Sequence, residues 1–377
     1  MLACVLGNTN LVRALGLAGI RSAVVARRDA PAAYSRFTAE RIEWADNWGD
    51  PERLVSNLLE FGAHHPGVPL FYQHDGDLVL VSRHREALRE RFRFVIADAA
   101  LVEQLVEKTR FIALAERTGL PVPPSLVLSP RANDAVAEIP FDYPIALKPV
   151  TRRDVIWAPL AGHAKALEVH SQGELATLWP RLADAGVDFV AQTLIPGEED
   201  RIESYHVYVD ERGEVAGEFT GRKLRTYPRR YGETTALTIT DEGDLRELGR
   251  RCVRALDLRG VAKFDFKRAP SGELFLLEVN ARFNLWHLPG AVAGVNLAAL
   301  VYADLVGLPR PQTRLRPGVR WSLPWYDLRA SREYGIALPR WLAWQAGCET
   351  RHIVAADDPM PFVRGMVWRR LRRRLRR

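Results

Sequence analysis

The first hundred residues alternate short apolar runs with stretches whose apolar positions recur every three or four residues. The apolar runs predict strands at residues 2–6, 22–27, 69–73 and 94–97. The helical periodicity predicts helices at residues 11–19, 51–61 and 77–92. Strands and helices that alternate in this way are typical of a small parallel α/β domain. Its first loop holds only Gly7, so we interpret it as an ordinary turn and not as a glycine-rich nucleotide site.

The pattern changes after residue 98. One helical stretch covers residues 101–119 and ends at Gly119, where a proline-rich segment follows. Another helix is predicted to begin at Ser171, which forms a capping box with Glu174. Further strands are predicted at residues 143–150, 165–169, 189–195, 203–210 and 214–225, and a further helix at residues 244–257. Beyond about residue 310 the chain is rich in Trp, Pro and Arg, which predicts an appendage.

A β-hairpin with a polar face is predicted at residues 261–282. If residues 269–272 form its turn, Asp265 lies opposite Leu276 and one diagonal step from Glu278. Alternation along the two strands then places four polar side chains on one face, namely Asp265, Glu278, Asn280 and Arg282. A slip of one residue in the register would separate them.

The two carboxylates and the amide of this face form a hard, all-oxygen donor set. Diagonal neighbours lie about 7–8 Å apart at the backbone, so Asp265 and Glu278 can converge on one ion or on two adjacent ions. Mg²⁺ prefers such ligands and keeps positions open for water and phosphate oxygens. The alternative is a solvated face on which Lys263 and Lys267 pair with the carboxylates. Asn280 and Arg282, which follow Glu278 at alternating positions, favour the metal site over the solvated face.

The amino-acid composition indicates which partners and which cellular compartment to expect. The net charge of +7 comes from the last nine residues, which hold seven arginines, because the remaining Lys and Arg equal the 46 Asp and Glu. Nucleic acid is therefore not predicted as a partner. The three cysteines lie far apart and form neither a metal-binding nor a disulfide pattern, and no run of eighteen apolar residues is present, so a cytoplasmic protein is expected.

The C-terminal tail has a pattern of its own. In residues 361–377, Val363, Val367, Leu371 and Leu375 recur four residues apart among the arginines. A basic amphipathic helix of this kind suits peripheral contact with an anionic membrane, at its inner face. A solvated or disordered tail is the alternative.

Several motifs, in their order along the chain, resemble the ATP-grasp superfamily. A strand Asp paired with a later Glu-x-Asn carries the resemblance, and GVAKFDFK with LFLLEVNARF resembles the carboxylate–amine ligase branch. Weaker matches are SRF, FRFVIAD, EKTRFIALAERTGLPVP, YPIALKP, QTLIPGEED, FTGRKLRTYP and DDPMP. The resemblance implies an N-terminal parallel α/β (pre-ATP-grasp) domain at residues 1–98, followed by a two-lobed ATP-grasp domain. The central lobe would cover residues 99–191, the C-terminal lobe residues 192–310, and an extension residues 311–377.

The resemblance also implies roles for single residues. Contacts with ATP would come from Lys108 and Lys148 at the phosphates, Glu198 or Glu199 at the ribose, and backbone groups of the strand with Gln192 and Leu194 at adenine. Mg²⁺ would be held by Asp265, Glu278 and Asn280. Arg282 would stabilise the transferring phosphoryl group, and Lys223 and Arg225 would face the phosphates or a substrate carboxylate. These residue types suit phosphoryl transfer, which depends on positioning and charge neutralisation.

One segment departs from the family's pattern. The loop expected to cover the phosphates is glycine-rich in many ATP-grasp proteins, but residues 150–165 hold one glycine. Either Thr151, Arg152 and Arg153 act there through their side chains, or substrate closes the loop. The basic cluster around Lys223 has a similar alternative, because such a cluster can be a solvated loop.

Two further groups of residues have open interpretations. His74, Asp75 and Asp77 follow a predicted strand, where parallel α/β domains bind ligands, but an ordinary polar loop is the preferred interpretation. Trp286 and His287 either line an acceptor pocket or belong to the core.

The resulting hypothesis is an ATP- and Mg²⁺-dependent ligase. It would activate a carboxylate as an acyl-phosphate and join it to an amine, releasing ADP and phosphate, with small-molecule or peptide substrates. The alternatives are an ATP-grasp ligase or carboxylase with another acceptor, and a non-catalytic ATP-binding scaffold at the membrane surface. The complete polar face of the hairpin favours catalysis. The oligomeric state is left open.

Overall fold

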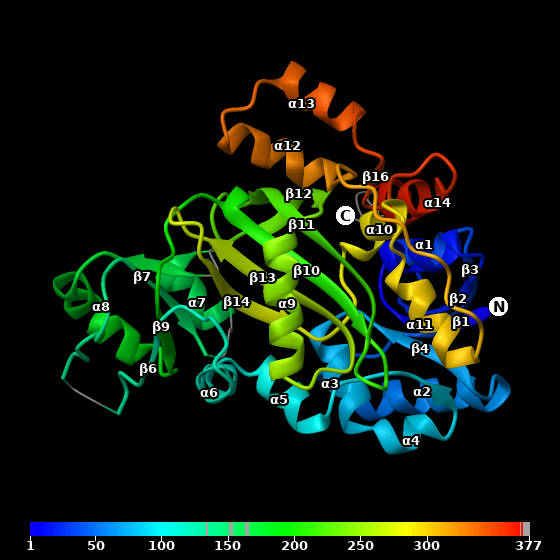
Figure 1. Ribbon diagram of the computed structural model, residues 1–377, viewed down its shortest axis with the longest axis horizontal. Coiled ribbons are helices and arrows are strands. Elements are labelled where there is room, and N and C mark those ends of the chain that lie inside the picture. The colour runs from blue at the N-terminus through cyan, green and yellow to red at the C-terminus, as the bar shows by residue number, and fades with distance from the viewer. Residues whose placement is uncertain (133–134, 151–153, 163–165, 370, 372–377) are drawn as a thin grey trace.

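The computed structural model describes residues 1–132, 135–150, 154–162, 166–369 and 371. Three sheets organise this part of the chain (Figure 1). The first is parallel, with the order β3-β2-β1-β4-β5. Its strands are β1 (Leu2–Leu6), β2 (Arg21–Ala26), β3 (Thr38–Glu43), β4 (Val68–Tyr72) and β5 (Phe92–Arg93). Its helices are α1 (Thr9–Leu17), η1 (Pro31–Tyr34), α2 (Pro51–His64), α3 (Asp75–Arg83) and α4 (Arg85–Arg89).

This N-terminal sheet confirms the predicted parallel α/β domain. The central strands β1 and β4 are buried on both faces, which explains their continuous apolar runs. Strand β3 was not predicted, because it lies at the sheet edge and buries only Ile42. The helix predicted over residues 77–92 is divided into α3 and α4 at His84.

The second sheet is antiparallel and forms the central lobe, at the left of Figure 1. Its strands are β6 (Ser125–Leu128), β7 (Ile145–Pro149), β8 (Leu167–Val169) and β9 (Phe189–Thr193). Helices α7 (Asp154–Ala161) and α8 (Gln172–Asp184) pack on it, with Trp157, Trp179 and Phe189 in the shared core. Ser171 caps α8 by accepting a hydrogen bond from the Glu174 N–H at 3.1 Å. Strand β9 spans the boundary expected between residues 191 and 192.

The helical pattern at residues 101–119 forms two helices and not one. They are α5 (Ala99–Val106) and α6 (Lys108–Thr118). Glu107 between them is extended and accepts hydrogen bonds from the N–H groups of Thr109 at 2.9 Å and Arg110 at 3.0 Å. The cap starts a new helix, because its carboxylate satisfies donors that a continuous helix would use internally. Lys108 consequently occupies the first position of α6.

The third sheet has seven strands in the order β14-β13-β10-β11-β12-β15-β16. The strands are β10 (Ile202–Val209), β11 (Val215–Tyr227), β12 (Glu233–Thr240), β13 (Gly260–Arg268), β14 (Leu274–Asn280), β15 (Arg320–Ser322) and β16 (Thr350–Arg351), and η2 (Glu199–Arg201) precedes them. Helix α9 (Gly243–Ala255) lies across one face, and the other face packs on α10 (His287–Val292) and α11 (Leu297–Val306) (Figure 1). A Cβ atom at Gly249 would lie 2.2 Å from the Tyr205 ring, so glycine permits the close approach of α9 to β10.

The C-terminal segment is more than an appendage. Strand β15 pairs with β12 and β16 with β15, so residues beyond 310 extend the large sheet. The remaining elements are α12 (Pro324–Glu333), α13 (Leu338–Ala346), α14 (Met360–Phe362) and the π-helix η3 (Val363–Trp368). Helices α12 and α13 stand above the sheet in Figure 1, and α14 lies near the N-terminal domain. Trp325 of α12 stacks on Phe362 of α14, with ring centroids 6.3 Å apart.

The hairpin register differs from the prediction. Arg268 pairs with Leu274 and Phe266 with Leu276, one residue away from the expected pairing. That slip alone would separate the polar side chains, but a β-bulge between Asp265 and Phe266 corrects it. Asp265 therefore lies directly opposite Glu278, and Lys263 lies opposite Asn280. The predicted face is formed, by a different route and with closer carboxylates.

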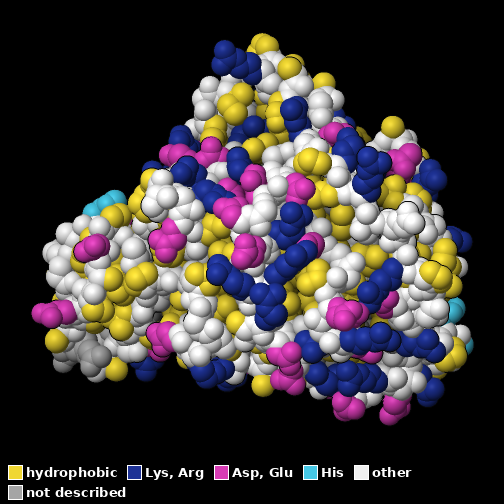
Figure 2. Space-filling model, viewed as in Figure 1, with side chains coloured by type: hydrophobic (Ala, Val, Ile, Leu, Met, Phe, Trp, Pro, Cys, Tyr) yellow, Lys and Arg dark blue, Asp and Glu magenta, His cyan; other side chains and the backbone are white. Residues whose placement is uncertain are grey.

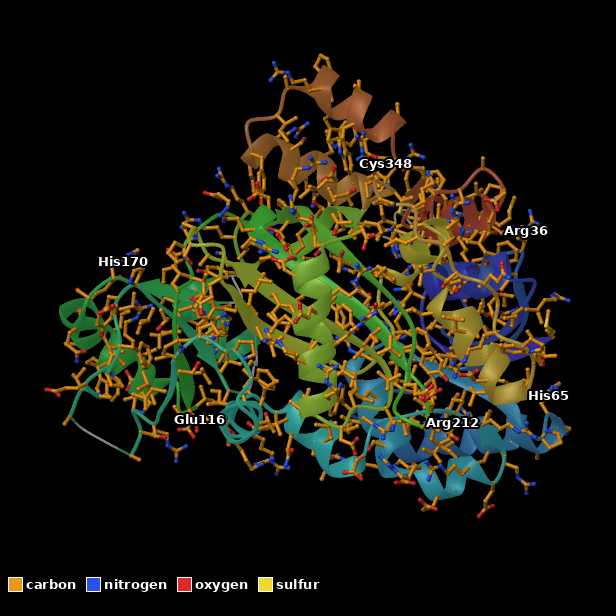
Figure 3. The ribbon with its side chains drawn as sticks, viewed as in Figure 1. Arg36, His65, Glu116, His170, Arg212 and Cys348 are labelled. Carbon is orange, nitrogen blue, oxygen red and sulfur yellow. The ribbon has the colours of Figure 1, made fainter. Side chains whose placement is uncertain are left out.

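None of the described helices combines the length and apolarity that a membrane crossing requires. Figure 2 shows Lys and Arg side chains over α9 and the N-terminal domain, with Asp and Glu among them. Cys4, Cys252 and Cys348 are buried free thiols, and Figure 3 places Cys348 beyond the end of α13. Burial raises the pKa of Cys252 to about 12 and that of Cys348 to about 11, so both stay protonated.

Candidate functional site

A cavity of about 530 Å³ lies between the sheet of the central lobe and the large sheet. Its polar lining includes Asp75, Lys108, Lys148, Gln192, Glu199, Lys223, Asp265, Lys267, Glu278 and Asn280. Most of the predicted site residues are therefore brought together, although they come from elements far apart in the chain. The apolar remainder includes Phe111, Ile112, Ala146, Val190 and Leu194.

Strand β13 supplies the floor of this cavity through simple alternation. Ala262, Phe264 and Phe266 are fully buried in the core below α9. The intervening Asp265 and Lys267 line the cavity on the opposite face. A period of two thus separates core from site within a single strand.

Asp265 is a buried carboxylate that is satisfied by protein cations. Lys263 Nζ donates to Asp265 Oδ2 at 2.6 Å, Lys223 Nζ lies 3.4 Å from the same oxygen, and Ser204 Oγ donates to Oδ1. Burial by itself would raise the pKa of Asp265, but Lys223 and Lys263 outweigh it and hold the pKa well below its ordinary value. The carboxylate is therefore ionised.

Glu278 completes the carboxylate pair at the mouth of the cavity. Its side chain is 58% exposed, and Lys263 Nζ lies 3.8 Å from Glu278 Oε1. The Lys263 ammonium thus contacts both carboxylates, as the alternative interpretation of the hairpin expected. Lys267 does not contact both carboxylates. Among the acidic side chains, Glu199 has the largest effect on the pKa of Lys267 and raises it.

The fit of this face to a metal ion depends on three oxygen donors. Among the described residues, no group of three or more His, Cys, Asp or Glu side chains could hold a metal ion. A site would therefore need the Asn280 amide oxygen, which accepts a hydrogen bond from Arg282 at 2.9 Å, while Asn280 Nδ2 is buried without a partner. Glu278, Asn280 and Asp265 supply oxygen donors of the kind that Mg²⁺ prefers, with Asp265 paired to Glu278 across the two strands, and an ion there would share Asp265 with the lysines.

Lys148 and Lys108 both reach the cavity from the side of the central lobe. Lys148 Nζ donates to Gln192 Oε1 at 3.0 Å, and Lys108 Nζ donates to the carbonyls of Pro149 at 2.7 Å and Val150 at 3.1 Å. Burial lowers the pKa of Lys148, and the charges of Lys108 and Lys267 lower it further against the opposing effect of Glu278. Burial also lowers the pKa of Lys267. An anion in the cavity would relieve this repulsion.

The strand predicted to hold adenine lies at the cavity wall. The Gln192 side chain bridges Lys148 and Ser125. The Leu194 N–H already donates to the Pro144 carbonyl at 3.0 Å, so that backbone donor is occupied in this conformation. The apolar side chains around Leu194 in the cavity wall form a surface against which a flat base can pack.

Glu199 and Glu198, the two candidates for contact with the ribose, lie in different environments. Glu199 lines the cavity, is buried, and accepts a hydrogen bond from the Tyr231 N–H at 3.2 Å. Glu198 is half exposed and pairs with Arg229 at 3.1 Å, away from the cavity lining. Only Glu199 is in a position to contact a ligand here.

Arg282 is anchored to the N-terminal domain. Its guanidinium pairs with Asp75 at 2.5 Å and 3.2 Å and also donates to the Gln73 carbonyl at 3.2 Å. Asp75 itself lines the cavity. Arg282 thus lies directly behind the cavity lining, held by the carboxylate of Asp75 at the start of α3, in the segment that was interpreted as an ordinary polar loop.

Lys223 and Arg225 have different environments. Lys223 lines the cavity; burial acts to lower its pKa, but Asp265, Glu278 and Glu199 outweigh this and raise it. Arg225 is not part of the lining and pairs with the buried Asp327 of α12 through two contacts of 2.8 Å. Its guanidinium also lies 4.3 Å from the Trp344 ring centroid. The register of β11 shifts between Lys223 and Arg225, and the side chain of Arg225 meets Asp327 and not the cavity, so Arg225 does not face the cavity as the resemblance implied.

Trp286 and His287 belong to the core and not to the cavity lining. His206 stacks on Phe219 with centroids 4.5 Å apart, and Trp286 and His287 pack against it at 5.2 Å and 5.8 Å. Burial lowers the pKa of His287 to about 3, so its ring is neutral. The predicted loop residues Thr151, Arg152 and Arg153 lie outside the described residues.

Sequence reasoning missed two members of the site as functional candidates. Lys267 was treated only as a neighbour of the carboxylates, and Tyr231 was not considered, although both line the cavity. The signal for Lys267 was available, because it lies two residues from Asp265 on the same strand face. No local signal distinguishes Tyr231, which reaches the cavity through the loop between β11 and β12.

Known proteins resemble this chain over part of its sequence and in its fold. No family model matches the chain. The D-aspartate ligase of Enterococcus faecium (strain Aus0004) is 28% identical over 240 residues, which are 62% of this chain and 57% of that protein. The chain thus spans little more than half the length of this curated relative.

Solved structures extend the similarity to nearly the whole chain. The ADP complex of N5-carboxyaminoimidazole ribonucleotide synthetase has a TM-score of 0.65 at 14% identity, over 89% of this chain and 84% of that chain. The L-amino acid ligase from Bacillus licheniformis has a TM-score of 0.61 at 17% identity, over 85% of this chain and 78% of that chain. At these identities the similarity establishes the fold.

Proposed function

We propose that this chain is an ATP-grasp protein and an ATP-dependent ligase that joins a carboxylate to an amine. We divide it into the N-terminal domain (residues 1–98), the two ATP-grasp lobes (99–191 and 192–310) and the C-terminal extension (311–377). The observation that carries the proposal is the lysine-lined cavity between the two lobes, whose lining includes Asp265, Glu278 and Asn280, with Arg282 bonded to Asn280 behind it.

The lysines favour a polyphosphate ligand. Burial lowers the pKa of Lys148, and the nearby charges of Lys108 and Lys267 lower it further, which a neutral or cationic ligand would not relieve. A triphosphate would supply the missing negative charge, and the apolar wall near Leu194 would cover its base. Glu199 would accept hydrogen bonds from the ribose hydroxyls.

The chemistry follows from the residue types. A carboxylate oxygen of the substrate would attack the γ-phosphorus of ATP, and the bond to the bridging oxygen would break, leaving ADP. The nitrogen lone pair of the amine would then attack the acyl carbon; phosphate would leave with the electrons of the C–O bond, and the nitrogen would lose a proton to give an amide. Arg282 and Lys223 would neutralise the charge that develops on the transferring phosphoryl oxygens.

A divalent cation is part of the proposal. Glu278, Asn280 and Asp265 would hold one or two Mg²⁺ ions. Bound Mg²⁺ would neutralise charge on the phosphate oxygens of ATP.

The relatives suggest the substrate class. The similar proteins include a D-aspartate ligase and an L-amino acid ligase, so we infer that an amino acid is one of the two substrates. The reaction then forms an amide or peptide bond from that amino acid.

The test is Mg²⁺-dependent formation of hydroxamates. Full-length protein is incubated with ATP, hydroxylamine and pools of carboxylic acids that include amino acids of both hands, and products are detected by mass spectrometry. We expect a hydroxamate from one pool, formed only when both ATP and Mg²⁺ are present. Replacement Glu278→Gln should lower the rate at least about a hundredfold, because a metal ligand is lost.

Glu273→Gln is the matched control, since Glu273 lies at the exposed turn of the same hairpin. The proposal fails if Glu278→Gln and Glu273→Gln have equal rates. Binding of ATP without turnover in every pool would instead indicate the non-catalytic nucleotide-binding module.

We also propose that the C-terminal tail makes peripheral contact with an anionic membrane. Val363, Val367 and Leu371 are exposed in the helical segment that ends the described chain, among arginines whose charge complements anionic lipid. Full-length protein should co-sediment with vesicles that contain phosphatidylglycerol, and much less with pure phosphatidylcholine. The double variant Val363→Ser/Val367→Ser should lose this binding, whereas Val215→Ser, at an exposed strand position, should keep it. Equal binding of both variants would refute the contact.

A further inference from the structure

Exposed apolar side chains are concentrated in the C-terminal extension. Among the described residues, nine of the fifteen large apolar side chains that are exposed lie between residues 325 and 371. Four of the nine lie on α12 and α13, namely Trp325, Tyr326, Leu338 and Leu342. Figure 2 shows hydrophobic side chains at the top of the molecule, where α12 and α13 project, with Lys and Arg side chains beside them. A concentration of this kind marks a surface that binds a partner.

Helix α13 lacks the polar outer face that a surface helix normally has. Its outer positions are all exposed, and we call them the outer face of α13: Leu338, Pro339, Leu342, Ala343 and Ala346. At 3.6 residues per turn these positions span an arc of about 140°. Leu338 and Leu342 lie one turn apart and are 56% and 53% exposed. Because an apolar helix face is normally covered, this face is expected to have a partner.

The inner face of α13 fixes which side of the helix is exposed. Trp341 Nε1 and Gln345 Nε2 donate hydrogen bonds to the buried Asp327 of α12, both at 2.9 Å. The Trp344 ring centroid lies 4.3 Å from the guanidinium of Arg225, which pairs with the same carboxylate. Rotation of α13 to bury its leucines would break these contacts and leave buried polar groups without partners. The outer face is therefore exposed because the contacts of the inner face are specific.

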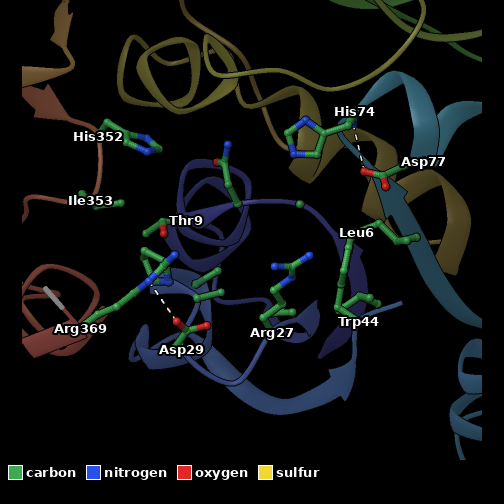
Figure 4. Close-up of a pocket in the computed structure, with 17 residues that line it drawn as sticks. Leu6, Thr9, Arg27, Asp29, Trp44, His74, Asp77, His352, Ile353 and Arg369 are labelled. Atoms are coloured by element: carbon green, nitrogen blue, oxygen red, sulfur yellow. Dashed lines mark hydrogen bonds and ion pairs between the residues drawn. The ribbon is translucent and has the colours of Figure 1, made fainter. Parts of the chain in front are cut away.

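The tail does not cover the outer face of α13, because it is tied to the N-terminal domain. Asp358 accepts hydrogen bonds from Ser35 Oγ at 2.6 Å and from the Arg36 N–H at 2.8 Å. Arg369 lies at a smaller cavity, of about 300 Å³, beside the N-terminal sheet, where it pairs with Asp29 at 2.9 Å (Figure 4). The partner of the outer face is therefore not the described part of the tail.

The charges around the outer face of α13 are mainly positive. Arg340 lies at the edge of that face, and Arg329 and Arg332 are exposed on α12. In the part of the chain that the structure describes, neither Arg332 nor Arg340 forms an ion pair. The acids of the two helices are engaged, because Asp327 is buried in its ion pair and Glu333 accepts a hydrogen bond from the backbone of a neighbouring loop at 2.6 Å. A partner of this surface should be apolar and negatively charged.

An anionic lipid surface meets both requirements. Leu338 and Leu342 would leave water for the apolar boundary of the bilayer, while the long Arg340 side chain would reach the headgroup phosphates. Trp325 and Tyr326, exposed on α12, are residue types that concentrate at membrane–water interfaces. A second copy of this chain fits less well, because a two-fold interface would bring the arginines of one face toward those of the other.

We propose that the outer face of α13 binds an anionic membrane, with its leucines in the headgroup region and the arginines of α12 and α13 at the lipid phosphates. This surface lies on a different element from the tail, so its contact does not require the tail to bind, and it goes beyond the ligase reaction. The two elements would act together, since a single small apolar anchor holds a protein at a membrane only marginally.

The experiment measures the partition of full-length protein onto vesicles by co-sedimentation at increasing lipid concentration. The vesicles contain phosphatidylglycerol mixed with phosphatidylcholine, or phosphatidylcholine alone. We expect Leu338→Ser/Leu342→Ser to bind the phosphatidylglycerol vesicles at least about tenfold more weakly than the wild type, because two leucine side chains no longer leave water. Leu308→Ser is the matched control, since Leu308 is 49% exposed outside the extension, and it should bind as the wild type does. Arg340→Gln should weaken binding and reduce its dependence on salt.

A fluorescent label reads the contact directly. Leu342→Cys is labelled with the environment-sensitive fluorophore NBD, and Leu308→Cys is labelled as the control. The native thiols of Cys4, Cys252 and Cys348 are buried, so the label is directed to the introduced thiol. On phosphatidylglycerol vesicles the emission of the label at residue 342 should shift to shorter wavelength, as expected when the label leaves water, and that at residue 308 should not.

The membrane contact is refuted if the wild type does not bind phosphatidylglycerol vesicles, if it binds both kinds of vesicle equally, or if Leu338→Ser/Leu342→Ser and Leu308→Ser partition equally. Unchanged emission at residue 342 on vesicles that carry the protein would also refute it. Sedimentation velocity without lipid tests the second copy: a wild-type dimer that Leu338→Ser/Leu342→Ser dissociates would assign the face to self-association and overturn the membrane contact. The hydroxamate assay is run in solution on the same variants, so failure of the ligase proposal and failure of this contact are read separately.

Discussion

The buried ion pair between Arg225 and Asp327 provides the sharpest test of how the C-terminal extension is attached. Asp327 is fully buried and accepts two hydrogen bonds from Arg225 at 2.8 Å. It also accepts hydrogen bonds from Thr235 Oγ1 at 3.0 Å and from Trp341 Nε1 and Gln345 Nε2 at 2.9 Å. One carboxylate thus joins strands β11 and β12 to helices α12 and α13.

Replacement Asp327→Asn removes the charge and turns one acceptor into a donor. Removal of one partner from a buried ion pair costs about 3–5 kcal/mol, because the other charge stays buried without compensation. Each neutral hydrogen bond that fails adds about 1 kcal/mol. We expect a loss of at least about 3 kcal/mol in the free energy of unfolding, measured by urea denaturation and followed by tryptophan fluorescence, to which Trp341 and Trp344 contribute.

The control is Asp257→Asn, which breaks a pair with Arg259 at 2.8 Å in which the Asp257 side chain is 88% exposed. Exposed pairs contribute about 0–1 kcal/mol, so this variant should be nearly as stable as the wild type. In an Arg225→Met background, Asp327→Asn should lower the free energy of unfolding much less, because no buried guanidinium is left without its counter-ion. A cost below about 1 kcal/mol for Asp327→Asn in the wild-type background would refute the reasoning. Retained ATP binding by folded Arg225→Met would separate its structural role from catalysis.

Three other predictions concern packing, protonation and the nucleotide. Gly249→Ala should destabilise the protein by about 1–3 kcal/mol in urea denaturation, because its Cβ would overlap the Tyr205 ring at 2.2 Å, whereas Gly243→Ala, with open space around it, should not. The His287 pKa of about 3 lies below that of an unfolded histidine, near 6.5, so the unfolded state binds more protons between these two pH values. The free energy of unfolding should therefore fall by up to about 1.4 kcal/mol for each pH unit below 6.5. A His287→Gln variant should show a shallower fall. Lys148→Met should weaken binding of MgATP about tenfold or more in calorimetry without loss of stability in urea, because a buried ammonium is removed; equal affinity would contradict the phosphate role.

Local patterns predicted the chemistry of the hairpin because their information is local. A strand alternates its faces with a period of two, so the sequence around Asp265 separates Phe264 and Phe266 from the lysines without any tertiary information. The motif around Glu278 and Asn280 likewise predicted residues that line the larger cavity, and its resemblance to the ATP-grasp superfamily predicted the order of the domains. The residues lining the larger cavity include most of those predicted.

The register of the same hairpin could not be read locally. Its turn places Arg268 opposite Leu274, and the bulge beside Asp265 then restores the carboxylate pair. A bulge depends on pairing across two strands, so the single-strand pattern does not reveal it. The split between α5 and α6 was missed for a related reason, because the capping by Glu107 competes with a continuous helical pattern.

What the sequence predicted by itself is most of the strands and helices between residues 1 and 282 and the polar face of β13 and β14. What only the tertiary structure decided is which charges meet. Arg225 pairs with Asp327, 102 residues away, and Arg282 pairs with Asp75, 207 residues away, and no spacing along the chain encodes either contact. Ion pairs of this kind form where folding buries an arginine beside a carboxylate, since neither charge is stable there alone.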